Sequence, residues 1–115
     1  MKERINRIGE EVKKELARII GELKDPRIPM MTSVLRAEVT TDMKYCKAYV
    51  SILADEDGQN QALVALKSAE GFIRRELAQA IEIRYIPEIT FVLDKSIEHG
   101  THIDSILRGL KKEEE

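Results

Sequence analysis

The chain contains few of the residues that form disulfides, stack on bases or span membranes. Its single cysteine, Cys46, has no partner for an intramolecular disulfide. It has no tryptophan and 4% aromatic residues, so it lacks the usual platform of sheet-surface RNA binders that stack bases. No apolar run reaches the roughly 18–20 residues that span a bilayer. Its 19 basic and 21 acidic residues give a net charge of −2, which excludes a binder that coats polyanions through bulk positive charge.

The composition that remains is that of one small globular domain. A chain of 115 residues with 43% hydrophobic residues can bury a single core without disulfides or a metal. The last five residues, two lysines followed by three glutamates, have nothing to bury. We therefore expect a cytoplasmic protein with one domain over residues 1–110 and a frayed charged tail over 111–115.

The first half of the chain predicts a helix followed by a hairpin. Apolar residues recur every three or four positions between Ile5 and Leu23, which predicts an amphipathic helix of about five turns that stops before Pro26. Residues 31–40 and 45–53 alternate between apolar and polar side chains, as strands with one buried face do. In the first of these strands we expect one face to hold Leu35, Ala37 and Val39. The polar turn at 41–44 predicts that the two strands are antiparallel.

The second half predicts an interrupted helix and a third strand. We expect a solvated loop at 55–58 and then a helical stripe that runs to Ile81 through Gly71, where a glycine favours a bend or a close backbone approach. Residues 89–93 alternate as a strand, and Thr101 with Asp104 can cap a short last helix. The predicted fold is α+β, with helices on one face of a three-stranded sheet and the second and third strands parallel across a long crossover.

Catalytic signals are weak. The two histidines, His99 and His102, have no cysteine nearby and fall short of a metal-ligand set. The six glycines are isolated and no serine has a nucleophile-elbow setting, so we expect neither a phosphate loop nor a nucleophilic enzyme. A small hydrolase that uses paired carboxylates is a weaker hypothesis than the two binding functions described below.

The local clusters of basic residues point more clearly to a function than the catalytic signals do. Arg4 and Arg7 share a stripe of the first helix, and Arg27 follows in the turn. The alternative is a solvated face with internal ion pairs. Arg74 and Arg75 follow Gly71 by one helical turn, where a phosphate can approach a bent helix, unless they pair with neighbouring glutamates. Because exposed aromatic residues are scarce, contact through shape and phosphates is the expected mode of any nucleic-acid binding.

Several strings occur in a specific order along nearly the whole chain. They are Glu22-Leu23-Lys24-Asp25-Pro26-Arg27 after the first helix, Ala48-Tyr49-Val50-Ser51 in the second strand, Gly71-Phe72-Ile73-Arg74-Arg75-Glu76-Leu77 in the interrupted helix, and Ser96-Ile97-Glu98-His99-Gly100 with Ile103-Asp104 near the end. With these strings and this order of elements, the chain resembles the ribosome-binding factor A family of bacterial small-subunit assembly factors.

The resemblance implies a type II KH-like fold of α-β-β-α-kink-α-β order plus a short last helix. In this fold Ala69-Glu70-Gly71 takes the place of the GxxG loop that clamps nucleotides in other KH domains. It also implies a non-enzymatic monomer without a cofactor that binds the free small (30S) ribosomal subunit and its 16S rRNA. Late maturation, including 16S rRNA 5′-end processing, and growth in the cold are the implied roles. The implied contact residues are Arg4, Arg7, Arg27, Ala69, Gly71, Arg74, Arg75 and Arg84.

A second hypothesis is a protein-interaction module that uses an exposed sheet or helix face. The near-neutral charge and the few exposed aromatic residues are compatible with it. The two hypotheses differ in their response to nuclease, because a protein partner survives the loss of RNA. The RNA hypothesis predicts that charge reversal at Arg74 and Arg75 weakens binding to free small subunits.

Overall fold

The computed structural model describes residues 2–95. The expected last helix, the histidine pair and the charged tail lie outside the described residues. The domain boundary at residue 110 therefore stays a prediction.

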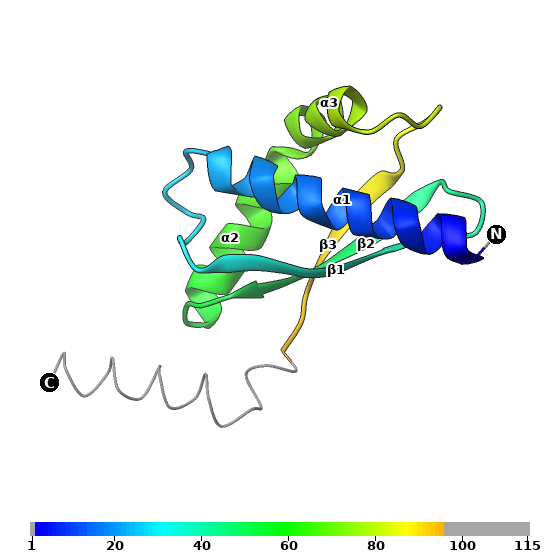
Figure 1. Ribbon diagram of the computed structural model, residues 1–115. Coiled ribbons are helices and arrows are strands. Elements are labelled where there is room, and N and C mark those ends of the chain that lie inside the picture. The colour runs from blue at the N-terminus through cyan, green and yellow to red at the C-terminus, as the bar shows by residue number, and fades with distance from the viewer. Residues whose placement is uncertain (1, 96–115) are drawn as a thin grey trace, which may run out of the picture.

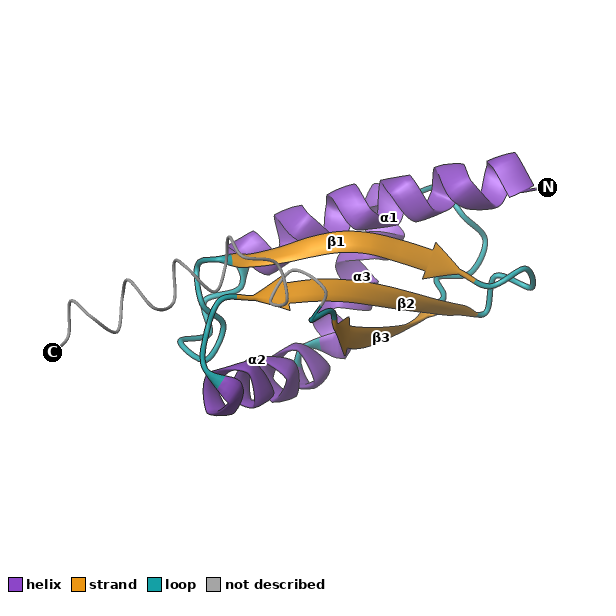
Figure 2. Cartoon of the chain, turned by 90° about the horizontal axis from the view of Figure 1, so that it is seen from below, coloured by secondary structure: helices purple, strands orange, loops and turns teal. Residues whose placement is uncertain are grey.

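Three helices and a three-stranded mixed sheet form the described part of the chain, which confirms the predicted α+β class (Figure 1). In chain order the elements are α1 (Lys2–Glu22), β1 (Thr32–Val39), β2 (Tyr45–Ile52), α2 (Glu56–Ser68), α3 (Glu70–Ala80) and β3 (Glu88–Leu93). The strand order is β1-β2-β3, with β1 antiparallel and β3 parallel to β2, as predicted. Figure 2 shows α1 and α3 behind the sheet and α2 alongside β3, so that no described helix crosses the near face of the sheet.

The core lies between the helices and the inner face of the sheet. The stripe of α1 predicted from the sequence supplies its largest part, and Leu16 and Ile19 are fully buried. The alternation of β2 places Cys46, Ala48 and Val50 on the same inner face, as predicted. Among the other buried core residues are Ile8, Val12, Ile20, Ile52, Leu66, Ile73, Leu77 and Ile89.

A β-bulge changes the inner face of β1. Val34 pairs with Val50, but the next pairing joins Arg36 to Tyr49, so Leu35 has no partner on β2. The extra residue puts Val34 in the core and lets Ala37 pack against the core from the same face, although the two are three positions apart. The prediction that Leu35 shares the face of Ala37 was therefore wrong, because strict alternation fails at a bulge.

The interruption of the second helical region is confirmed, but it lies at Ala69 and not at Gly71. Ala69 has φ −89° and ψ 4°, and its N–H still bonds back to the carbonyl of Ala65 at 3.1 Å. Gly71 lies inside the first turn of α3, without a positive φ. A Cβ atom at Gly71 would meet Arg75 Nη1 at 3.8 Å, which is an ordinary contact. The break therefore does not depend on the conformational freedom of glycine.

The expected solvated loop before α2 is largely the first turn of that helix. Asp55 is its N-cap, and its carboxylate Oδ1 accepts a hydrogen bond from the N–H of Gly58 at 2.8 Å. The acidic residues that suggested a loop therefore stabilise the start of a helix, where negative charge is favoured.

Gly9 lies at a close approach between α1 and the sheet, and it generates a stability prediction. A Cβ atom there would lie 2.7 Å from the carbonyl oxygen of Ala37, so alanine must push helix and strand apart. We expect Gly9→Ala to lower the free energy of unfolding by roughly 1–3 kcal/mol in urea titrations.

Gly21 is the matched control, because it lies on the same helix with nothing within 4 Å of an added Cβ. Gly21→Ala should be neutral or stabilising by up to about 1 kcal/mol. Equal stability of the two variants would show that the approach at Gly9 is not tight.

Candidate nucleic-acid interface

Three segments that are far apart in the sequence surround a hollow of about 620 Å³ at one end of the molecule. They are the start of α1, the turn between β1 and β2, and the chain that joins α3 to β3 (Figure 1). We call this the basic hollow, because its lining includes the cations Arg4, Lys44 and Arg84. The full lining is Arg4, Asp42, Met43, Lys44, Glu82, Ile83, Arg84, Tyr85 and Ile86.

The β1–β2 turn presents Lys44 to this hollow from a hydrogen-bonded frame. The carboxylate Oδ1 of Asp42 accepts from Thr40 Oγ1 at 2.6 Å and from the N–H of Lys44 at 3.0 Å. These two hydrogen bonds lower the pKa of Asp42, and the bond from the Thr40 hydroxyl has the larger effect. Met43 takes a left-handed conformation with φ 61°, which closes the turn. The backbone of Lys44 is therefore held in place by the turn itself.

The segment between α3 and β3 carries the other side of the hollow. Arg74 reaches from α3 and donates from Nη2 to the carbonyl of Ile86 at 3.1 Å, which ties the segment to the helix. Arg84 places its guanidinium carbon 5.5 Å from the centroid of the Tyr85 ring. Tyr85 is nevertheless 72% exposed. The structure places this tyrosine in the lining of the hollow.

The structure brings together some of the arginines that were predicted as contacts. Arg4 and Arg84 line the basic hollow, and Arg74 borders it through its bond to Ile86. Arg7 is exposed one turn further along α1. Arg75 lies with a guanidinium nitrogen near Gly71, beside the helix break.

Arg27 lies apart from the others. It follows the C-terminal end of α1, which lies about 27 Å along the helix from Arg4. Its Nη2 is 2.7 Å from Asp25 Oδ2, and hydrogen bonds from the Arg27 side chain and backbone lower the pKa of Asp25 to about 2. Arg27 is thus paired within the loop after α1 and does not extend the basic hollow.

The sequence analysis missed Lys44 as a site residue. Its stretch, 41–44, was interpreted as a polar turn. The signal was in the topology: a strand that is antiparallel to β2 must end where β2 begins, and β3, parallel to β2, begins there too. The β1–β2 turn and the chain entering β3 therefore share one end of the sheet.

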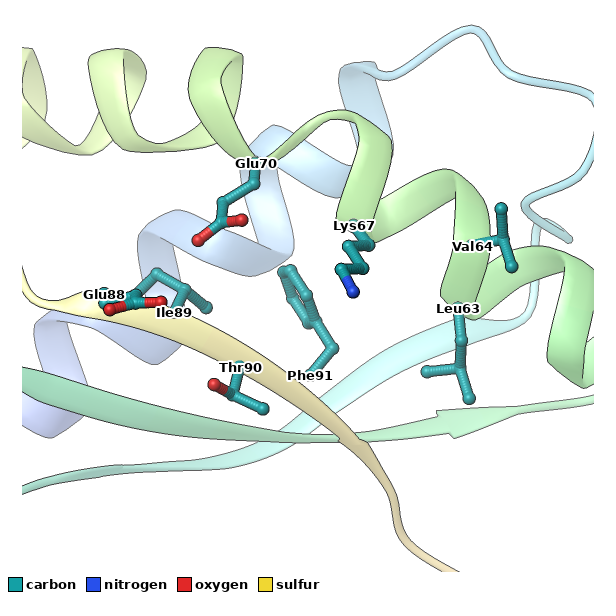
Figure 3. A pocket seen from close by; sticks show the side chains of 8 residues that line it. All are labelled: Leu63, Val64, Lys67, Glu70, Glu88, Ile89, Thr90 and Phe91. Carbon is teal, nitrogen blue, oxygen red and sulfur yellow. The ribbon is translucent and has the colours of Figure 1, made fainter.

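A second hollow lies between α2 and the edge strand β3 and holds about 450 Å³ (Figure 3). Leu63, Val64 and Phe91 make much of its wall apolar. Its charged lining is Lys67 with two carboxylates, Glu70 and Glu88. Because one cation faces two anions, this groove disfavours a phosphate chain, whereas three cations face two carboxylates in the basic hollow.

Within residues 2–95 no group of three or more His, Cys, Asp or Glu side chains is placed to hold a metal ion. Burial, with a smaller contribution from Glu38, raises the pKa of Cys46 to about 11, so its thiol stays protonated at neutral pH. No helix among the described residues is long and apolar enough to cross a membrane.

Comparison with known proteins identifies the family. Residues 4–107 match the family model of ribosome-binding factor A. The chain belongs to the ribosome-binding factor A family. Ribosome-binding factor A of Clostridium tetani is 55% identical over 115 residues, which cover 99% of this chain and 95% of that protein.

Solved structures of ribosome-binding factor A agree with the fold. The crystal structure of the protein from Thermus thermophilus superposes with a TM-score of 0.72 at 27% identity, covering 80% of this chain and 97% of that one. A homology model of the T. thermophilus protein, fitted into a cryo-EM map of a 30S complex of that protein, has a TM-score of 0.67 at 27% identity and covers 79% and 96% of the two chains.

The pairing of Arg27 is testable by titration. Arg27→Ala removes the guanidinium bonds to Asp25, so the pKa of Asp25 should rise from about 2 toward its ordinary value of 3.8, followed by NMR of the carboxyl carbon. Since the folded pKa is the lower one, the pair stabilises the fold above pH 3.8, and this contribution is lost as the pH falls through about 2. Arg84→Ala should leave the titration of Asp25 unchanged. An Asp25 pKa near 3.8 in the unsubstituted chain would refute the pairing.

Proposed function

We propose that this chain is a non-enzymatic assembly factor that binds the free small (30S) ribosomal subunit and contacts its 16S rRNA. The observation that carries the proposal is the basic hollow, where Arg4, Lys44 and Arg84 converge from three segments. Membership of the ribosome-binding factor A family supports it, as does the fit of the T. thermophilus relative into a map of a 30S complex.

The cations of the hollow are available for phosphate contacts. Arg4, Lys44 and Arg84 form no ion pair within residues 2–95. By contrast, Arg18 contacts Glu15 at 2.8 Å and Arg36 contacts Glu38 at 3.1 Å. A guanidinium without a carboxylate partner gains more from a phosphate, because it breaks no existing pair on binding. The charge that matters is therefore local and coexists with a net charge of −2.

The predicted contact residues take different roles in this proposal. Arg4 and Arg84 hold phosphates at the hollow, and Arg74 positions the segment that carries Arg84. Arg7 extends the contact along α1, and Arg75 extends it toward the helix break. There the side chains of Ala69 and Gly71 are small, so they leave room for an RNA backbone to approach. Arg27 at the far end would meet a separate part of the rRNA.

Binding is sufficient for the proposed role. A factor of this kind stabilises one conformation of the rRNA by binding it more tightly than the alternatives, which needs neither a cofactor nor a second copy of the chain. The proposed function includes promotion of late maturation of the small subunit, with 16S rRNA 5′-end processing, and a role in growth in the cold. We propose that the protein acts as a monomer in the cytoplasm.

Charge reversal at the hollow tests the function. Arg4→Glu with Arg84→Glu should weaken co-sedimentation with free small subunits by on the order of tenfold for each lost contact. The slope of log affinity against log salt should become shallower by about 0.7–0.9 for each contact. Arg74 is left unchanged, because its bond to Ile86 gives it a structural role.

Lys14→Glu with Lys24→Glu is the matched control, since it changes the net charge equally at positions outside the hollow. Circular dichroism checks that both variants are folded. If both doubly substituted chains bind alike, or if the original chain does not sediment with small subunits at all, the proposed function is wrong.

A protein-interaction module is the second candidate, favoured by the groove beside β3. Among residues 2–95 this strand pairs only with β2, and Val64 on the facing helix is 56% exposed. An extended apolar peptide that adds to the edge of β3 would suit such a groove. Loss of small-subunit binding in Val64→Glu, with binding retained in the Arg4→Glu and Arg84→Glu variant, would favour this candidate.

A further inference from the structure

We propose that the basic hollow accepts one unpaired nucleotide, with its base stacked on Tyr85 and its flanking phosphates held by Arg4, Lys44 and Arg84. This inference rests on the proposed function and specifies the form of RNA that the site takes. No bond is made or broken in this binding.

Tyr85 is the tyrosine placed to stack on a base beside cations. The ring of Tyr49 is covered by the guanidinium of Arg36, whose Cζ lies 3.9 Å from the ring centroid. Tyr45 is 53% exposed, but it lies outside the lining of the hollow. The guanidinium Cζ of Arg84 lies farther from the ring centroid of Tyr85, at 5.5 Å, and Tyr85 is 72% exposed and lines the same hollow as the three cations. An aromatic ring next to cations suits a nucleotide, which offers a flat base next to an anionic phosphate.

The rest of the lining fits the same ligand. Met43, Ile83 and Ile86 add apolar surface for a base that has left its stack. The volume of about 620 Å³ lies within the roughly 300–1,000 Å³ of small-ligand sites. The carboxylates of Asp42 and Glu82 repel a further phosphate but accept hydrogen bonds from base amino groups or a ribose 2′-hydroxyl.

A double helix fits the hollow poorly. Its bases are stacked on one another and reach the outside by their edges, so the face of Tyr85 would have no base to meet. The cations also surround one depression instead of following a row along a backbone. A single-stranded loop, bulge or end presents a free base together with its phosphates, and this is the element the site selects.

A double-mutant cycle between ring and base tests the inference. The probes are a short single-stranded oligoribonucleotide of mixed sequence and the same backbone with abasic sites, each bound to the full chain and to its Tyr85→Ala variant. Fluorescence anisotropy gives the four affinities. Stacking predicts that Tyr85→Ala weakens binding of the complete strand by about 5- to 150-fold. It predicts a much smaller effect on the abasic strand, because the base is already missing.

Tyr85→Phe is the conservative control and should bind like the unsubstituted chain, because the ring and not the hydroxyl does the stacking. A duplex of the same sequence should bind more weakly than the single strand. Equal effects of Tyr85→Ala on both strands, equal affinity of the abasic and complete strands, or preference for the duplex would overturn the inference.

These results separate the inference from the proposed function. Chains that sediment with free small subunits, and lose this in Arg4→Glu with Arg84→Glu, but bind both oligonucleotides equally would keep the function and lose the stacked nucleotide. Failure to sediment with small subunits, with the ring-to-base coupling intact, would instead place the nucleotide site in another RNA-binding role.

Discussion

The close contact between α1 and β1 at Gly9 and Ala37 fixes the geometry on which the candidate site depends. With a Cβ at position 9 only 2.7 Å from the carbonyl of Ala37, no side chain larger than hydrogen fits without separating the two elements. Ala37 lies near the end of β1, and Arg4 is just over one helical turn before Gly9. This contact therefore sets where the start of α1 meets the β1–β2 turn, and so where Arg4 lies relative to Lys44.

The other wall of the site depends on the route of the chain from β2 to β3. The break at Ala69 divides the crossover into α2, which packs near β3, and α3, which contacts α1. From α3, Arg74 reaches the carbonyl of Ile86 and anchors the segment that carries Arg84 and Tyr85. A continuous helix would point this segment elsewhere, so the break has a positional role that does not require direct contact with RNA.

The sequence predicted the helices and strands better than it predicted which side chains come together on the surface. Periodicity identifies α1 and the inner face of β2, because burial acts on every turn and every second residue. Periodicity failed at Leu35, where one bulged residue shifts the alternation. It also failed at Ala69, because an alanine in the sequence gives no sign of a helix break. Lys44 and Tyr85 could not be found from local patterns, since their proximity to Arg4 arises from tertiary packing. The pairing of Arg27 was likewise invisible, because an arginine that bonds Asp25 has the same sequence signature as a free one.

On the sheet face that no described helix covers, the charged side chains neutralise one another. Arg36 on β1 contacts Glu38 on the same strand and Asp94 just beyond β3, at 3.1 and 3.2 Å, and lies over Tyr49 on β2. This cluster links all three strands and leaves little field at the centre of that face. A polyanion that diffuses toward the molecule is therefore attracted more strongly to the end that holds the basic hollow than to this face of the sheet. Electrostatic attraction therefore favours approaches in which the end with the basic hollow leads.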